Sequence, residues 1–171
     1  MNPGCGEADF AEIYEAYFPK VYHYIYSCLL HREVAEDVTA EVFFAALRSF
    51  AFYDPARGAM STWISAIARN RVRNYFQKAH VRYEIPQEEP LPEETPDLPA
   101  DGADSLRDPE NQVLHRILQK LSPEERDFLE LRFGLGLTYG EIGGLLGVSS
   151  EGVRKRYDRL LEKCRRLGNM K

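Results

Sequence analysis

The chain has 171 residues, of which 44% are hydrophobic, so it can form one medium domain or two small ones with an apolar core. No apolar run approaches the roughly 20 residues that a membrane-spanning helix needs, and the start, MNPGCGEADF, lacks the basic and apolar stretches of a signal peptide. We therefore expect a cytoplasmic protein with no direct membrane insertion. Its cysteines, Cys5, Cys28 and Cys164, are odd in number and far apart, which argues against a disulfide framework.

The net charge of −5 is distributed unevenly along the chain. Residues 84–110 hold ten acids and one base, so this segment carries −9 and the rest of the chain carries +4. Within the rest, residues 66–83 hold five bases and no acid, and residues 151–171 hold eight bases and three acids. Two basic patches separated by an acidic segment are typical of a nucleic-acid-binding protein. A solvated charged face is the alternative for each patch taken singly.

Residues 8–82 show apolar and aromatic side chains at three- and four-residue steps, which predicts three helices. A turn-rich loop at 53–58 separates the second helix from the third. We expect Ser61 or Thr62 to cap the third helix, which then runs to about Ala79. The predicted core positions are Phe10, Ile13, Tyr14, Tyr17, Val21, Tyr24, Ile25 and Cys28 in the first helix, Val34, Val38, Val42, Ala45, Ala46 and Leu47 in the second, and Trp63, Ile64, Ile67, Ala68, Val72 and Tyr75 in the third.

A flexible linker is predicted at 83–108, because this segment is rich in proline and acids and has almost no large apolar side chains to bury. Helical periodicity resumes at Pro109, a residue that suits the first turn of a helix. Ser122 and Glu125 then form a capping box with proline at the first helical position. The sequence therefore predicts a second helical domain that begins at Pro109.

A helix–turn–helix is predicted near the end of the chain. Thr138 and Glu141 form a second capping box, Gly147 stands where a helix end needs a left-handed backbone, and Ser149 can cap the next helix. We expect Val148 to point inward. At least one of the glycines at 143 and 144 is expected to allow the two helices to approach closely. The last helix carries Val153, Tyr157, Leu160, Leu161 and Cys164 on one face and Arg154, Lys155, Arg159, Lys163, Arg165 and Arg166 on the other.

A helix, a tight glycine turn and a basic amphipathic helix form the geometry that places a reading helix in the DNA major groove. Two packed helices with a solvated basic face are the alternative. We predict an all-α protein of two small helical domains, 8–82 and 109–168, joined by the flexible acidic, proline-rich linker 83–108. The second domain is the helix–turn–helix.

The segments FAEIYEAYFPKVYHYIY, AEDVTAEVF and FYDPARGAMSTWISAIARNRVRNYF resemble the promoter-melting domain of bacterial sigma factors. The segment LSPEERDFLELRFGLGLTYGEIGGLLGVSSEGVRKRYDRLLEKCRRL resembles their promoter-recognising C-terminal domain. This layout is similar to that of the extracytoplasmic-function (ECF) group of the sigma-70 family. The resemblance implies a transcription initiation factor that directs core RNA polymerase to a two-part promoter and assists DNA melting. It implies no catalysis, metal or cofactor, and it implies an anti-sigma factor as a further partner.

The resemblance also implies a polymerase-binding face on the second predicted helix. Carboxylates on an otherwise aliphatic helix suit a complementary charged contact, although they are also compatible with a face that is merely solvated. Ala40 stands where the family usually has glutamine, so we expect weaker affinity for core polymerase. The residues that match the polymerase contact are Asp37, Ala40, Glu41 and Phe44.

The loop before the third predicted helix and the helix itself match the part that captures an unstacked base of the melted promoter element. A basic groove with polar edge contacts and aromatic rings holds single-stranded bases. Trp63 could stack on a base, but we expect it in the core. Asn74 replaces a usual aspartate, and Gln77 and Lys78 stand where arginines are typical, so the grip on phosphates is expected to be softer. The implied DNA-binding residues are Arg57, Thr62, Arg69, Asn70, Arg73, Asn74 and Gln77.

The beginning of the last predicted helix matches the segment that reads the upstream promoter element. Arginine and lysine donors suit the acceptors of guanine, so Arg154 and Lys155 are the expected base readers. Arg159 is expected on the phosphates. The full set is Ser149, Ser150, Glu151, Arg154, Lys155, Arg156 and Arg159.

An enzyme is poorly supported, since the four histidines are scattered and no Ser-His-Asp, Walker or glycine-rich phosphate motif is present. The strongest alternative is a helix–turn–helix regulator whose first domain senses a ligand or partner. Its second domain alone would bind DNA specifically, whereas a sigma factor would need polymerase to hold both domains in register. A pure protein-interaction module is the third hypothesis, and its nucleic-acid binding would show no salt dependence.

Overall fold

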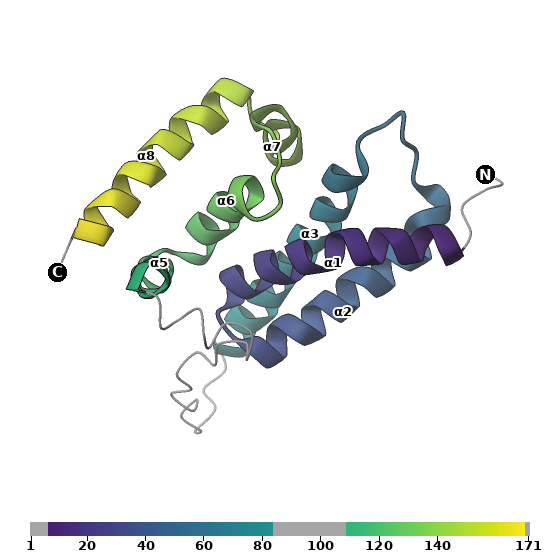
Figure 1. The fold of residues 1–171 in the computed structure, drawn as a ribbon, viewed down its shortest axis with the longest axis horizontal. Helices are drawn as coiled ribbons and strands as arrows, with labels where there is room; N and C mark the ends of the chain where they lie inside the picture. The colour runs from purple at the N-terminus through teal and green to yellow at the C-terminus, as the bar shows by residue number, and fades with distance from the viewer. Residues whose placement is uncertain (1–6, 84–108, 170–171) are drawn as a thin grey trace.

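The computed structural model describes residues 7–83 and 109–169, and within these ranges it is helical with no strand (Figure 1). The predicted all-α fold is confirmed for the described residues. Most of the linker predicted at 83–108 lies outside them, and the division into domains at 8–82 and 109–168 stays a prediction. The elements are α1 (Glu7–Leu29), α2 (Arg32–Ser49), the short 3-10 helix η1 (Phe50–Phe52), α3 (Met60–Tyr83), α5 (Pro109–Lys120), α6 (Pro123–Phe133), α7 (Tyr139–Leu146) and α8 (Ser150–Asn169).

The N-terminal bundle consists of α1, α2, η1 and α3, which pack on one another around the predicted apolar stripes. His31 caps α2, since its ring accepts a hydrogen bond from the Val34 amide at 3.4 Å. The predicted cap of the third helix is wrong. The Ala59 carbonyl already accepts a bond from the Trp63 amide at 3.1 Å, so α3 begins at Met60 and residues 61 and 62 lie inside its first turn.

The C-terminal bundle consists of α5 to α8, and its predicted capping signals are confirmed. Core positions predicted from periodicity are wrong where the side chain is exposed, in both bundles: Tyr14, Leu47, Tyr75, Leu114 and Phe133. Ser122 and Thr138 each form a complete capping box, and Gly147 is left-handed with φ of 70°. A Cβ added at Gly143 would lie 2.7 Å from the Val148 carbonyl oxygen, so this glycine permits the close approach of the turn. The prediction that Val148 points inward is wrong: its side chain is 51% exposed, because its carbonyl rather than its side chain faces α7.

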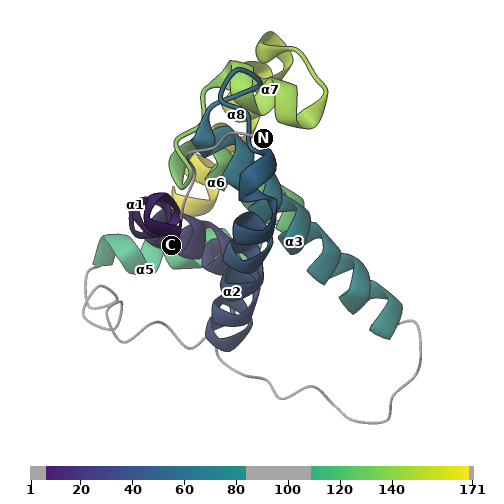
Figure 2. The same cartoon turned by 90° about the vertical axis from the view of Figure 1, so that its right-hand side faces the viewer.

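The two bundles pack against each other. Helix α6 contacts α1, and α7 lies beside the beginning of α3 (Figure 2). The buried apolar side chains of both bundles, from Phe10 to Leu160, form a single continuous cluster. Among the described helices, none is both long and apolar enough to cross a membrane. The packing between bundles brings the predicted DNA-binding face of α3 next to α6, α7 and α8.

Candidate polymerase and nucleic-acid interface

The predicted polymerase-binding residues share one face of α2. Asp37, Ala40, Glu41 and Phe44 follow the three- and four-residue steps of a helix, and all four are exposed. Phe44 is 63% exposed, and the Arg48 guanidinium lies 5.8 Å from the centroid of its ring. Glu41 lies 3.7 Å from the Arg71 guanidinium of α3. The face therefore combines carboxylates with an exposed aromatic ring.

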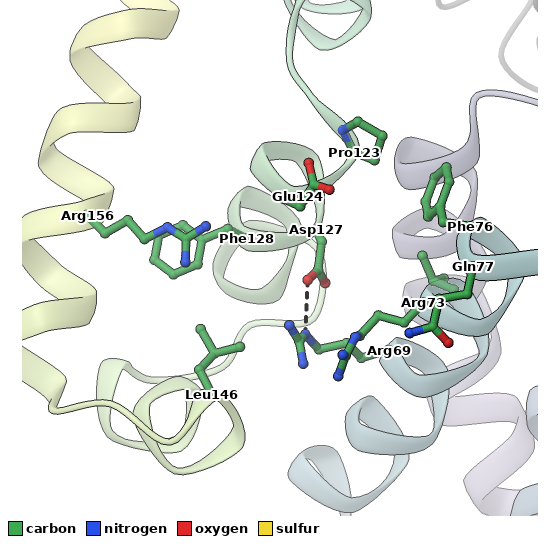
Figure 3. A pocket seen from close by; sticks show the side chains of 11 residues that line it. Arg69, Arg73, Phe76, Gln77, Pro123, Glu124, Asp127, Phe128, Leu146 and Arg156 are labelled. Carbon is green, nitrogen blue, oxygen red and sulfur yellow. Dashed lines mark hydrogen bonds and ion pairs between the residues drawn. The ribbon is translucent and has the colours of Figure 1, made fainter. Parts of the chain in front are cut away.

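The predicted residues on α3 divide into two sets. Arg69, Arg73 and Gln77 recur at four-residue steps and line a cavity of about 660 Å³ between α3, α6 and α8 (Figure 3). Asn70 and Asn74 lie one position further along the helix and are exposed to solvent outside this cavity. Of the first set, only Arg69 is largely covered by the C-terminal bundle, while Arg73 and Gln77 remain exposed at the cavity.

The loop before α3 and the first turn of that helix hold the other predicted residues for the melted element. Arg57 is exposed, and its amide donates to the Asp54 carbonyl at 3.0 Å in the turn. The Thr62 hydroxyl donates to the Glu141 carboxylate of α7 at 2.8 Å. Trp63 is half-buried, with its ring 5.3 Å from that of Tyr53, so it packs at the edge of the core as expected.

Helix α8 is held in the C-terminal bundle by one face. Val153, Tyr157 and Leu160 are buried, and the Tyr157 ring stacks on Phe128 of α6 at 4.3 Å between centroids. The Tyr157 hydroxyl donates to the Phe128 carbonyl, and burial raises the pKa of this tyrosine. The hydroxyl of Ser149 accepts from the Gly152 amide at 3.1 Å, as expected of a cap. These contacts set the orientation of the opposite face.

That opposite face presents the predicted readers of the upstream element. Lys155 pairs with Glu151 at 2.8 Å, one turn earlier on the same exposed surface. Arg156 differs from the others: its guanidinium lies 4.3 Å from the centroid of the Phe128 ring, and it lines the cavity that α3 also lines (Figure 3). The exposed predicted residues are Ser149, Ser150, Glu151, Arg154, Lys155, Arg156 and Arg159.

A carboxylate that the sequence analysis did not single out joins the two bundles. One oxygen of Asp127 in α6 accepts from the Tyr24 hydroxyl at 2.7 Å. The other accepts from the Arg69 Nε at 3.0 Å (Figure 3). The acidic composition of α6 against the basic composition of α3 is the signal that could have indicated this pairing. Local periodicity carries no information about it.

Further ionisable groups are buried between α1 and α6. Glu130 is 6% exposed, and burial raises its pKa to about 7, although a hydrogen bond from Ser27 opposes the shift. The His23 side chain is 63% exposed and lies 3.7 Å from Glu130. Because desolvation lowers the pKa of His23, its ring is mostly neutral near neutral pH and forms no strong ion pair with Glu130. One oxygen of Glu130 and the Nε of Arg126 have no hydrogen-bond partner. Over the part of the chain that the structure describes, no group of three or more His, Cys, Asp or Glu side chains could hold a metal ion.

Comparisons with known proteins agree with this architecture. The family model described as Sigma-70 region 2 matches residues 13–81, and that described as Sigma-70, region 4 matches residues 117–166. The chain is 30% identical over 171 residues to the ECF RNA polymerase sigma factor BldN of Streptomyces coelicolor, covering 95% of this chain and 61% of BldN. It is 28% identical over 163 residues to the ECF RNA polymerase sigma factor RpoE of Cereibacter sphaeroides, covering 93% of this chain and 86% of that relative.

A solved structure shares the fold. The sigma factor RpoE of Bartonella quintana, in complex with the anti-sigma factor NepR, matches with a TM-score of 0.72 at 17% identity. The match covers 95% of this chain and 98% of that one. The two matched regions, in this order and on this all-helical fold, account for most of the chain. The chain belongs to the ECF group of the bacterial sigma-70 family, and it is a transcription initiation factor rather than an enzyme.

Proposed function

We propose that this chain acts in the cytoplasm, binds core RNA polymerase through the exposed face of α2, and directs the polymerase to a two-part promoter. Asp37 and Glu41 offer negative charge, and Phe44 offers an exposed ring that a partner would bury. Charged groups steer and orient a complex, while a buried aromatic residue supplies much of its affinity. Ala40 leaves the centre of this face without a polar contact, so the affinity is expected to be modest.

DNA binding is divided between the two bundles in this proposal. Helix α8 enters the major groove at the upstream element, where Arg154 and Lys155 donate to base edges and Arg159 contacts phosphate. The face of α3 with the loop before it holds the melted strand, with Arg69 and Arg73 on phosphates and Asn70 on a base edge. Extruding a base costs a few kcal/mol of unstacking, which these contacts offset.

An anti-sigma factor is the further partner that we propose. The support is the likeness to RpoE of Bartonella quintana, which was solved with the anti-sigma factor NepR. Such a partner would inhibit this chain by covering the α2 face or the DNA-facing surfaces of α3 and α8.

The observation that carries the proposed function is the presence, in one chain, of an exposed acidic and aromatic face on α2 and an exposed basic face on α8. The test is co-elution of the chain with bacterial core RNA polymerase. We expect Glu41→Lys to weaken the complex about ten-fold or more, because like charges across an interface cost several kcal/mol. Glu162→Lys makes the same charge change on the exposed surface of α8 and serves as the control. Failure of the native chain to bind at micromolar concentration would instead favour a regulator whose first domain senses a ligand.

A second test separates base reading from phosphate binding at α8. Arg154→Ala should lose about 1–3 kcal/mol of discrimination at one position of the upstream element. Arg159→Ala should weaken binding to all sequences alike and reduce the salt dependence. Both are measured with holoenzyme on a promoter selected from a random library and on its single-base variants. An equal loss on every sequence for Arg154→Ala would make that residue a phosphate contact.

A further inference from the structure

The cavity between α3, α6 and α8 has the volume and lining of a small-molecule site (Figure 3). Its volume of about 660 Å³ lies in the range of pockets that hold ligands the size of a nucleotide. We propose that this cavity binds a purine nucleoside mono- or diphosphate in the free chain. This binding does not require the role proposed for α3 in DNA recognition, and it adds a small-molecule ligand to the macromolecular partners.

Part of the cavity lining is apolar. Val72 of α3 and Phe128 of α6 are 2% and 3% exposed, and Phe76 and Leu146 beside them are half-buried. An apolar lining with a few polar groups is the usual composition of a small-molecule site, and the ring of Phe76 offers a flat surface for stacking. A ligand that fills this space therefore carries a ring, which an inorganic anion lacks.

Arg156 of α8 presents a flat and charged surface to the same space. Its guanidinium lies 4.3 Å from the centroid of the Phe128 ring, and Phe128 stacks on Tyr157 with ring centroids 4.3 Å apart. This column of two rings and a guanidinium holds Arg156 in place, although the residue is exposed. Bases stack on guanidinium planes as they do on aromatic rings, so a purine can extend the column into the cavity.

The charge that remains available in the cavity favours an anion. Asp127 is already occupied, because it accepts from Tyr24 with one oxygen and from Arg69 with the other. Arg73 lies exposed on α3, across the cavity from Arg156 (Figure 3). No carboxylate of the described residues forms an ion pair with Arg73. A guanidinium binds phosphate through two parallel donors, so Arg73 is the expected phosphate ligand.

Glu124 limits the charge of the ligand and offers it an acceptor. This residue lines the cavity from the first turn of α6. Hydrogen bonds from its own amide and from the Ser122 side chain lower the pKa of Glu124, so the group remains a carboxylate near neutral pH. A carboxylate accepts from ring amino groups or ribose hydroxyls, and it repels further phosphates. A nucleotide with one or two phosphates therefore fits this cavity better than a polyphosphate or a nucleic-acid strand does.

The test is equilibrium dialysis of the full chain with radiolabelled GDP or ADP, with the parent nucleosides, and with inorganic phosphate. We expect a dissociation constant of about 0.1 mM for at least one of the two nucleotides. The nucleosides and phosphate should bind about ten-fold more weakly or less, because each lacks one of the two contacts. No binding of GDP and ADP at millimolar concentration would overturn the proposal. Equal affinity for inorganic phosphate would also overturn it, since the cavity would then recognise charge alone.

A matched pair of substitutions places the nucleotide in the cavity. Arg156→Lys and Arg166→Lys both keep the positive charge and remove the planar guanidinium. Arg166 is exposed near the end of α8 and does not line the cavity. We expect Arg156→Lys to weaken nucleotide binding about ten-fold and Arg166→Lys to leave it unchanged. Equal affinities of the two variants would place the nucleotide elsewhere and overturn the proposal.

A second variant and a second ligand complete the test. Phe76→Leu removes the ring from the α3 side of the cavity and keeps an apolar side chain, so it should also weaken nucleotide binding by several-fold. It replaces Arg156→Lys if circular dichroism shows that the latter is unfolded, and unchanged affinity would then overturn the proposal. A short 5′-phosphorylated single strand shares the chemistry of the nucleotide, and we expect it to compete with labelled GDP or ADP no better than the free nucleotide does. Stronger competition by the strand would overturn a free nucleotide as the occupant.

Discussion

Two helices of the C-terminal bundle are held in opposite ways. Helix α8 packs inside its own bundle through Val153, Tyr157 and Leu160, which are buried and apolar apart from one hydroxyl. Helix α6 packs against the N-terminal bundle, where Asp127 bonds to Tyr24 and Arg69 and where further ionisable groups are buried. The first contact is mainly apolar, with one ion pair between Lys163 and Glu125 of α6 at 2.6 Å. The second adds further ion pairs and hydrogen bonds to the apolar cluster that both bundles share.

This difference bears on how easily α8 separates from its own bundle and how easily α6 separates from the N-terminal bundle. Separating an apolar contact exposes apolar surface to water, which costs roughly 25 cal/mol of free energy per Å². Water offers no interactions that replace the lost contacts. Separating a polar seam returns charges to water, which recovers much of the cost of desolvating them. The recognition helix is therefore held in its bundle mainly by apolar packing, while the contact of that bundle with α1 and α3 combines apolar packing with polar groups.

The largest effect is expected for Ile142→Ala in α7, which tests the apolar packing within the C-terminal bundle. This side chain is fully buried at 0% exposure, so its truncation should lower the free energy of unfolding by about 2–5 kcal/mol. Urea unfolding followed by circular dichroism measures the change. Leu114→Ala in α5 is the control, because that side chain is 50% exposed and its loss should cost less than about 1 kcal/mol. Equal decreases in the free energy of unfolding for the two variants would show that the buried apolar core of the bundle stabilises it no more than its exposed side chains do.

The polar seam predicts a dependence of stability on pH. Because burial raises the pKa of Glu130 from 4.5 to about 7, the packed form binds a proton more tightly than the unfolded form. This contribution to the free energy of unfolding is complete below about pH 4.5, is lost as the pH rises to about 7, and amounts to at most about 3 kcal/mol. Glu130→Gln should remove this slope.

The free energies of unfolding of the native chain and of Glu130→Gln are measured by urea unfolding from about pH 4.5 to about pH 8. The contribution of Glu130 is the difference between the two values at each pH. The lowered pKa of His23 acts in the opposite direction, and the difference cancels it. Parallel curves for the two chains would contradict the raised pKa of Glu130. The Cys28 thiol of α1 is a further titratable group that interacts with this carboxylate.

The turn between α7 and α8 offers a matched pair of glycines. A Cβ at Gly143 would lie 2.7 Å from a backbone oxygen, so Gly143→Ala should destabilise the chain by about 1–3 kcal/mol. Nothing lies within 4 Å of a Cβ added at Gly144, so Gly144→Ala should stabilise the chain by up to about 1 kcal/mol. Thermal unfolding measures both. The same sign for the two substitutions would mean that α7 and α8 approach less closely than this structure has them.

The smallest effect is expected on the exposed face of α8. Glu151 and Lys155 form an ion pair of 2.8 Å, but their side chains are 75% and 68% exposed. Glu151→Gln should therefore change the free energy of unfolding by less than about 0.5 kcal/mol. A larger decrease in the free energy of unfolding would mean that this face stabilises the fold in addition to its proposed role in DNA binding.

Local signals in the sequence were sufficient for most of the elements. Both capping boxes, the left-handed Gly147 and the close approach at Gly143 depend on residues within a few positions of one another. The errors also have local causes: α3 begins one turn earlier because the Ala59 carbonyl is free to start it, and Val148 turns its carbonyl rather than its side chain toward α7. The polymerase and DNA residues predicted from the family resemblance stay predictions.

The sequence by itself determined the helices, the capping boxes of α6 and α7 and the faces that carry charge, because each depends on the spacing of residues along one helix. Only the tertiary structure decided that Asp127 meets Arg69 and Tyr24, which lie 58 and 103 positions away. The same holds for Thr62 and Glu141, separated by 79 positions. Long-range pairings depend on how whole bundles pack, and many arrangements of two charged faces satisfy the same local pattern.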